Sequence, residues 1–311
     1  MSATDADALI TQAGLATTQP IAIAARGRRG RVSAVTGYWP DGGPVQAGDL
    51  FYAASLTKQV TGAIIARLVQ SGSIDPDFPV PQNFLPRWTV LPTVRQVLHH
   101  TASLPEAGRL ENALDGGSWT SEYVMQMAAE LAPPDCPIGS AFAYSNLGYV
   151  MLARLAEQVA GRTFAELAAD VLPSSAASGM AFFATGALPV SPHAALLGSS
   201  LPLTTGDGGL WTTADAYADF LDMQNEDRSG AARLTQADHR LRNGEFVRYG
   251  WGIGIRTLAG HPLYIHGGGW TGARCKAIRS PALGLSVVVL TVGEQDAAIS
   301  ALVDKLAEAV A

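Results

Sequence analysis

The stretch AASLTKQVTGAIIARLV, residues 53–69, places Ser55 three positions before Lys58 at the start of an apolar run. The run predicts a helix, and residues three apart on a helix share one face, with Cβ atoms about 5–6 Å apart. Lys58 is one of three lysines among 21 basic residues, and a desolvated ammonium can exchange its proton whereas a guanidinium practically cannot. The spacing therefore permits Lys58 to exchange a proton with Ser55, which we take as a hypothesis. The alternative is a surface lysine at a helix start, where a cation opposes the helix macrodipole.

The composition indicates a large folded chain with no electrostatic preference for nucleic acid. The 311 residues are 48% apolar and 15% charged, which suffices for one large domain or two moderate ones. The net charge of −6 argues against nucleic-acid partners, and the basic cluster RGRRGR, residues 26–31, falls at the tip of an expected hairpin. No window holds the roughly 18 uninterrupted apolar residues of a membrane-spanning helix. We expect neither a nucleic-acid nor a membrane partner.

Targeting and metal signals are also weak. The chain begins MSATDADALI, with acids where a secretory signal would carry Lys or Arg. This predicts a cytoplasmic protein, or a periplasmic or secreted one if a leader has been removed. Cys136 and Cys275 cannot form a disulfide framework and lie near no Cys/His cluster. His99 and His100 are adjacent and so point apart, without a third ligand nearby. We expect no metal and no cofactor, and interpret the two histidines as structural.

Strand-like segments lie at both ends of the chain, and helical segments lie between them. Several helices carry start or stop signals, such as Thr163 with Glu166 as a capping box and Gly72 and Gly161 as breakers. Strands are expected over residues 20–25, 31–38, 261–267, 273–280 and 285–292. Helices are expected over residues 5–15, 56–70, 94–98, 122–131, 147–159, 164–171, 214–225 and 294–311, with long loops over 173–209 and 225–249.

These segments predict an α/β fold of the α+β type, in which both termini build one antiparallel sheet that helices flank. We expect a sheet-and-helix domain from residues 1–58 and 240–311. A mainly helical domain with long loops would comprise residues 59–239. The active site would then lie in the cleft between the two domains.

Two further segments are candidates to complete a site around Ser55. In FAYSNLGYVMLARL, Tyr144 and Asn146 lie just ahead of a helix, where both can face one cavity. A nearby ammonium favours the phenolate form of a phenol, so Tyr144 could take the Ser55 proton. A tyrosine that simply packs at a helix entry is the alternative. In YIHGGGWTG, His266 and three glycines end an apolar strand; such a backbone can pair with a ligand as an added strand would, or form a flexible turn.

Taken together, SLTK, YSN and HGG resemble, in order and separation, the SxxK, YxN and [KH]-[TSG]-G motifs of the serine β-lactamase and penicillin-binding-protein-like hydrolases. TVRQVLHHTASLP, GGLWTTADAYADF and YGWGIG resemble other regions of that family, so the resemblance runs from about Phe51 to Val292. It is nearest to the branch of class C β-lactamases, esterases and D-peptidases. The resemblance implies a β-lactamase/transpeptidase-like fold.

The resemblance also implies a role for each motif residue. Ser55 would be the nucleophile, Lys58 its activating partner, and Tyr144 the general base that later returns a proton to the leaving group. The backbone N–H groups of Ser55 and Gly269 would hold the oxyanion. The implied reaction is acyl transfer to Ser55 followed by hydrolysis of the acyl-enzyme. The other residues of the substrate-binding set would be Asn146, which also orients Lys58, with His266, Gly267 and Gly268.

The third motif departs from the KTG that is usual in β-lactamases. His266 and Gly267 stand where a Lys charge and a Thr hydroxyl would engage a substrate carboxylate, and a histidine titrates at about pH 6.5. Carboxylate recognition should therefore be weaker, unless Arg274 restores it. We expect hydrolysis of an uncharged ester, or of a D-amino-acid amide or peptide. The aromatic residues that could line the substrate pocket, or belong to the core, are Trp119, Tyr249, Trp251 and Trp270.

Other functions stay open at this point. A β-lactamase or DD-carboxypeptidase is the alternative within the same family. A penicillin-binding sensor or a non-catalytic scaffold is the alternative from a different class, although all three motifs retain their reactive residues. The expected partner is in each case a small-molecule ester, amide or peptide.

Overall fold

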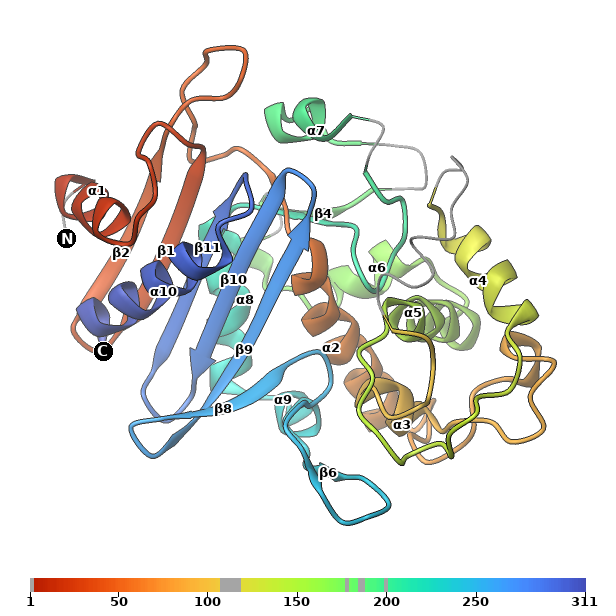
Figure 1. Cartoon of the computed structure of the whole chain (residues 1–311). Helices are drawn as coiled ribbons and strands as arrows, with labels where there is room; N and C mark the ends of the chain where they lie inside the picture. The colour runs from red at the N-terminus through yellow and green to blue at the C-terminus, as the bar shows by residue number, and fades with distance from the viewer. Residues whose placement is uncertain (1–2, 107–118, 177–178, 184–187, 199–200) are drawn as a thin grey trace.

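The two ends of the chain build one six-stranded antiparallel sheet. The computed structural model describes residues 3–106, 119–176, 179–183, 188–198 and 201–311. The strand order is β2-β1-β11-β10-β9-β8, and Figure 1 shows the red N-terminal strands beside the blue C-terminal ones. The strands are β1 (Ile21–Gly27), β2 (Gly30–Thr36), β8 (Gly254–Leu258), β9 (His261–Trp270), β10 (Ala273–Ser280) and β11 (Leu285–Thr291).

Successive side chains of β1 and β11 point to opposite faces of the sheet, and buried apolar side chains lie on both faces, so both faces of the sheet are covered. Every residue of β11 is buried, as expected for an apolar strand between two packed layers. Ile23 and Val289 belong to one core cluster with residues of α1 (Ala3–Gln12) and α10 (Asp296–Val310). The alternate residues Ala24 and Val288 belong to a second core cluster. In that second layer, α8 (Ala214–Glu226) packs against β1 and β11 from behind the sheet in Figure 1.

Helix α2, whose first ten residues are all buried, is the centre of the helical part. Helix α2 contacts α5, α6 and α9. These helices and the turns between them are α2 (Thr57–Gln70), α3 (Val94–Leu98), α4 (Ser121–Glu130), α5 (Asn146–Ala160), α6 (Phe164–Ala169), α7 (Pro192–Leu197) and α9 (Ala231–Thr235), with 3-10 turns η1 (Ala54–Leu56), η2 (Gln82–Phe84) and η4 (Ser174–Ala176). Short strands form two smaller sheets, β3 (Phe51–Tyr52) with β5 (Leu210–Thr212) and β4 (Met180–Phe182), and β6 (His239–Arg240) with β7 (Phe246–Val247).

The predicted fold class and the sheet built from both termini are confirmed. The expected hairpin around RGRRG pairs β1 with β2. Strand β9 extends to Trp270, three residues beyond the expected end. The region 173–209, predicted as a loop, lies partly outside the described residues and contains short elements such as β4 and α7. Within the described residues, no helix is both long enough and apolar enough to cross a membrane.

Candidate active site

Ser55 lies in η1, the single 3-10 turn between β3 and α2. Ala54, just before it, has a φ of 42°, a left-handed conformation that costs an ordinary residue about 1–2 kcal/mol. The hydroxyl of Thr57 donates to the carbonyl of Ala54 at 2.7 Å and thereby helps to hold this conformation. The turn leaves Ser55 partly exposed between buried neighbours. The sequence therefore presents the hydroxyl of Ser55 on a tightly constrained backbone.

Lys58, the second residue of α2, is fully buried and contacts Ser55 directly. Its Nζ lies 3.0 Å from Ser55 Oγ, 2.8 Å from Asn146 Oδ1 and 2.9 Å from the carbonyl oxygen of Asp207. Three acceptors match the three N–H bonds of an ammonium, so the buried cation is fully hydrogen-bonded. The predicted contact between Ser55 and Lys58 is thus present, and Asn146 joins it as an orienting group.

Tyr144 lies against the same lysine, at the entry of α5. The N-cap of α5 is Ser145, and the ring centroid of Tyr144 lies 5.0 Å from Lys58 Nζ. At this distance an ammonium is attracted by the ring. Tyr144 and Asn146, two residues apart, therefore both contact Lys58, as their spacing predicts.

His100 also belongs to this cluster, which the sequence did not indicate. Its ring centroid lies 4.4 Å from that of Tyr144 and 4.7 Å from that of Tyr249. His99, by contrast, bonds the Tyr249 carbonyl and accepts the indole N–H of Trp251. The two adjacent histidines therefore have different partners, and His100 is the one whose ring contacts Tyr144. The sequence shows only that His99 and His100 are adjacent, and this does not indicate which of the two side chains faces the site.

Strand β9 approaches the Ser55 turn at Gly268. A Cβ at this position would overlap Cys275 Sγ, and it would lie 2.8 Å from the carbonyl oxygen of Ala53 and 3.1 Å from the Ser55 nitrogen. Glycine is therefore required for this close approach. Gly267 and Gly269, on either side, are exposed. The three glycines of the motif thus form a bare strand edge beside the serine.

His266 is buried and both of its ring nitrogens are occupied. Because a carbonyl can only accept, Nδ1 carries the proton and donates to the Gly267 oxygen at 2.6 Å. Nε2 then accepts the hydroxyl of Tyr249 at 2.8 Å. Burial, and secondarily the charge of Lys58, lower the pKa of His266 to about 3. The expectation that His266 titrates at about pH 6.5 is therefore corrected, since this histidine is neutral at any physiological pH.

A groove of about 790 Å³ lies along β9 and β10 and is bordered by residues of α10, and Ser55, Lys58, Tyr144 and Asn146 are not among the residues that line it. Trp270 and Tyr249 line it, whereas Trp251 is completely buried. Arg274 also lines the groove, but its Nη1 donates to the carbonyl of Trp270 at 2.6 Å, and its Nε faces Asp296 at 3.4 Å. The guanidinium is thus held by internal partners. The charged residues along the groove are Arg256, Arg274, Lys276, Glu294 and Asp296.

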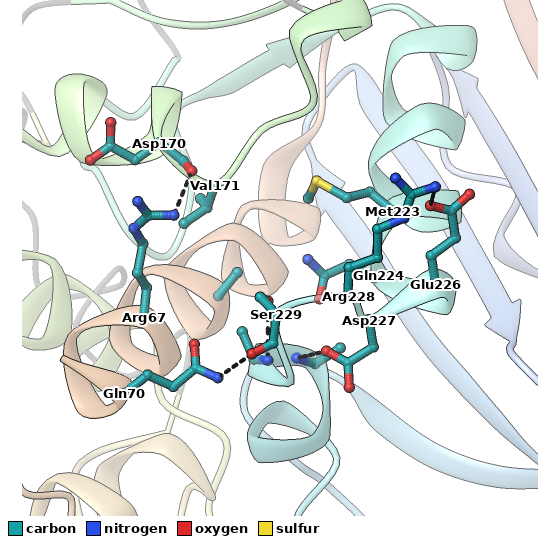
Figure 2. A pocket seen from close by; sticks show the side chains of 13 residues that line it. Arg67, Gln70, Asp170, Val171, Met223, Gln224, Glu226, Asp227, Arg228 and Ser229 are labelled. Carbon is teal, nitrogen blue, oxygen red and sulfur yellow. Dashed lines mark hydrogen bonds and ion pairs between the residues drawn. The ribbon is translucent and has the colours of Figure 1, made fainter.

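A smaller cavity, of about 290 Å³, lies at the opposite end of α2 (Figure 2). Its polar rim is paired internally: Arg67 donates to the carbonyl of Asp170, and Gln70 to that of Ser229. None of the predicted site residues lines it. In the described part of the chain, no three His, Cys, Asp or Glu side chains are grouped so that they could hold a metal ion.

Comparison with known proteins identifies the family to which this arrangement belongs. The family model described as Beta-lactamase matches residues 10–310. The chain belongs to this family. A D-aminopeptidase of Cereibacter sphaeroides is 24% identical over 265 residues, which are 79% of this chain and 51% of that protein. The chain thus spans about half the length of the curated relatives it matches.

Solved structures of other proteins share the fold of this chain. The D-amino acid amidase from Ochrobactrum anthropi SV3 superposes with a TM-score of 0.80 and 18% identity, over 98% of this chain and 99% of that one. A D-stereospecific amidohydrolase from Streptomyces sp. superposes with a TM-score of 0.72 and 21% identity, over 97% and 98%. At these identities the likeness concerns the fold alone.

Proposed function

We propose that this chain is a serine hydrolase that cleaves an amide bond through an acyl-enzyme on Ser55, with a D-amino-acid amide or a short D-peptide as substrate. The observation that carries the proposal is the 3.0 Å contact between the nucleophile candidate Ser55 and a fully buried Lys58. Removing an ammonium group from water costs a large desolvation free energy. A buried lysine that bonds a partly exposed serine hydroxyl is therefore typical of a catalytic pair. Family membership and the names of the D-amino-acid-specific relatives support the substrate class.

The proposed reaction has two steps. Tyr144 takes the proton of Ser55 while Ser55 Oγ attacks the amide carbonyl, and the N–H groups of Ser55 and Gly269 hold the oxyanion. Tyr144 then gives that proton to the departing amine as the C–N bond breaks. Water attacks the resulting ester in the same way, which releases the acid and restores Ser55. Lys58 and Asn146 keep the polar groups oriented throughout.

The third motif argues against a β-lactam as the preferred substrate. A neutral, internally bonded His266 supplies no cation, and Gly267 supplies no hydroxyl. Arg274 is held by a backbone carbonyl and Asp296. The groove residue Lys276 bonds the hydroxyl of Ser300 at 2.7 Å. We therefore propose that the enzyme prefers an amide substrate without a carboxylate near the scissile bond over a β-lactam, which carries one.

A substrate panel tests the proposal. The purified chain is given D- and L-alanine p-nitroanilide, p-nitrophenyl butyrate, nitrocefin and penicillin G, and adducts are read by intact mass. We expect D-alanine p-nitroanilide to be hydrolysed faster than the L-enantiomer. We also expect a covalent adduct that Ser55→Ala abolishes. Ser71→Ala, an exposed serine at the other end of α2, should retain full activity. Preferred turnover of nitrocefin would overturn the substrate class, and the absence of both turnover and adduct would overturn the hydrolase itself.

The same panel tests the lysine. Lys58→Arg keeps the charge, but its longer planar group cannot occupy a position surrounded by three acceptors at 2.8–3.0 Å. We expect a loss of kcat of about a thousandfold or more, comparable to that of Ser55→Ala, because the residues act as a unit. Near-normal turnover by Lys58→Arg would contradict the mechanism.

A further inference from the structure

His100 binds the backbone on both sides of Tyr144. Its carbonyl accepts the N–H of Ala143 at 2.8 Å, and its ring Nδ1 accepts the N–H of Ser145 at 3.1 Å. Its ring packs against the phenol with a centroid distance of 4.4 Å and an interplanar angle of 39°. A tyrosine whose two neighbouring residues both donate a backbone N–H to one residue, and whose ring packs on that residue, has few orientations left.

The bond from Ser145 also decides the protonation state of the His100 ring. A backbone N–H can only donate, so Nδ1 is the unprotonated nitrogen and Nε2 carries the proton. Burial is the main cause that lowers the pKa of His100 well below its ordinary value, and the charge of Lys58 adds to it. The other titratable groups that act on it are His266 and His99, while the neighbouring rings are those of Tyr144, Tyr149 and Tyr249. The ring therefore stays neutral and keeps its acceptor.

We propose that His100 is a positioning residue that holds Tyr144 against Lys58 by means of its Nδ1 acceptor. The inference rests on the proposed function, because it assigns His100 a part in the reaction at Ser55. It also explains why a polar ring is retained at a fully buried position among aromatic rings, where an apolar one would cost less to bury. His100 touches neither Ser55 nor the expected substrate strand edge in any hydrogen bond of the described residues, so it acts through Tyr144.

The backbone at His100 dictates the variants that test this role. Its φ is 57°, which Gly and Asn tolerate better than most residues. His100→Gly keeps the backbone and its carbonyl bond to Ala143 but removes the acceptor and the ring. His100→Asn places Oδ1 near the position of Nδ1 and so restores the acceptor. His193 offers a matched control, because its Nδ1 likewise accepts a buried backbone N–H, that of Tyr52, at 3.2 Å.

Steady-state kinetics on the D-anilide separates positioning from folding. We expect His100→Gly to lower kcat by about a hundredfold, as small misplacements of a catalytic group do, with KM changed by less than about threefold. His100→Asn should recover kcat to within about tenfold of the parent chain. His193→Gly should lower the thermal midpoint while its kcat stays within about threefold. An equal loss of kcat in His100→Gly and His100→Asn, or a change in KM without a change in kcat, would overturn the positioning role.

A spectroscopic measurement on the parent chain keeps the test independent of activity and of variant folding. In nitrogen NMR of histidine-labelled protein, the signals of His100 are those that the His100→Asn spectrum lacks. These signals should show Nδ1 unprotonated and Nε2 protonated across about pH 5 to 8. A His100 ring that titrates in this range, or carries its proton on Nδ1, would overturn the inference even in an active enzyme. Failure of the proposed function shows differently, as the absence of Ser55-dependent turnover in the parent chain.

Discussion

Single atoms decide the geometry at the point where β9 meets the Ser55 turn. A methyl group at Gly268 would overlap Cys275 Sγ and press on the Ala53 carbonyl and the Ser55 nitrogen. We expect Gly268→Ala to lower the free energy of unfolding by about 1–3 kcal/mol, the usual cost of overpacking. It should also lower kcat, because the strand can only relieve the overlap by moving away from Ser55. Urea denaturation and the kinetics of the D-anilide measure the two effects.

Gly267 is the matched control for this prediction. A Cβ there would find its nearest neighbour, the carbonyl oxygen of Cys275, at 3.7 Å, which is ordinary van der Waals contact. Gly267→Ala should therefore change the free energy of unfolding by no more than about 0.5 kcal/mol. An equal loss of stability in both variants would show that chain flexibility, rather than the close approach at Gly268, determines the effect.

The sequence predicted those contacts of the site that depend on local spacing. Lys58 follows Ser55 by three residues across the junction of η1 and α2, and Tyr144 and Asn146 lie at one helix entry, so their spacing alone restricts their geometry. The contacts of His100 come instead from tertiary packing with segments more than forty residues away. For the same reason the sequence suggested an ordinary titration for His266, whose burial only the assembled fold provides. The catalytic roles themselves stay predictions.

At the scale of one element, the start of α6 carries a complete capping box. The Thr163 side chain accepts the Glu166 N–H, and the Glu166 carboxylate accepts the N–H of Thr163 at 2.8 Å. We expect Thr163→Ala to lower the free energy of unfolding by about 1 kcal/mol, because an N-cap acceptor is lost. Thr257→Ala, at an exposed position of β8, should change it by less than about 0.5 kcal/mol. Denaturant midpoints compare the two, and equal effects would argue against a contribution from the cap.

Elements with strong local signals were predicted well, and short ones were not. The helix stop at Gly161 is confirmed by its left-handed φ of 65°, and the apolar run 285–292 by the buried strand β11. Strands β3, β4 and β5 have two or three residues each, which is too short for a period of two to show in the sequence. They form because residues far apart in the chain, such as Phe51 and Thr212, meet in the fold.

At the scale of the whole molecule, the pairing of β1 with β11 joins the two ends of the chain. Ile21 pairs with Thr291 and Arg26 with Ser286, so the sheet cannot form before both termini are present. Strand signals at the two ends of the sequence were sufficient to predict this. The division into residues 1–58 with 240–311, and 59–239, stays a proposal. Helix α8, which lies within 59–239, packs on the sheet, so a boundary there separates elements that share one core cluster.

Buried neutral histidines link the stability of the whole molecule to pH. Burial lowers the pKa of His99 and His266 to about 3 and that of His193 to about 4, and it lowers the pKa of His100 in the same direction. In the unfolded chain each regains an ordinary pKa of about 6.5. Below that pH the unfolded state binds more protons than the folded one, so the stabilisation present above about pH 6.5 is lost as the pH falls towards the folded values.

We therefore expect the free energy of unfolding to be steady above about pH 6.5 and to fall below it, by up to about 1.4 kcal/mol per pH unit for each such histidine. Urea denaturation at about pH 7.5, 6.5 and 5.5 measures the slope, which gives the number of protons taken up on unfolding. His193→Asn should reduce that number by about one, whereas Ser71→Ala, at an exposed position without a titratable group, should leave it unchanged. A stability that does not change between about pH 7.5 and 5.5 would mean that the buried histidines take up protons in the folded protein as readily as in the unfolded chain, which is incompatible with the neutral acceptors that His100 and His266 provide around Tyr144 and Tyr249.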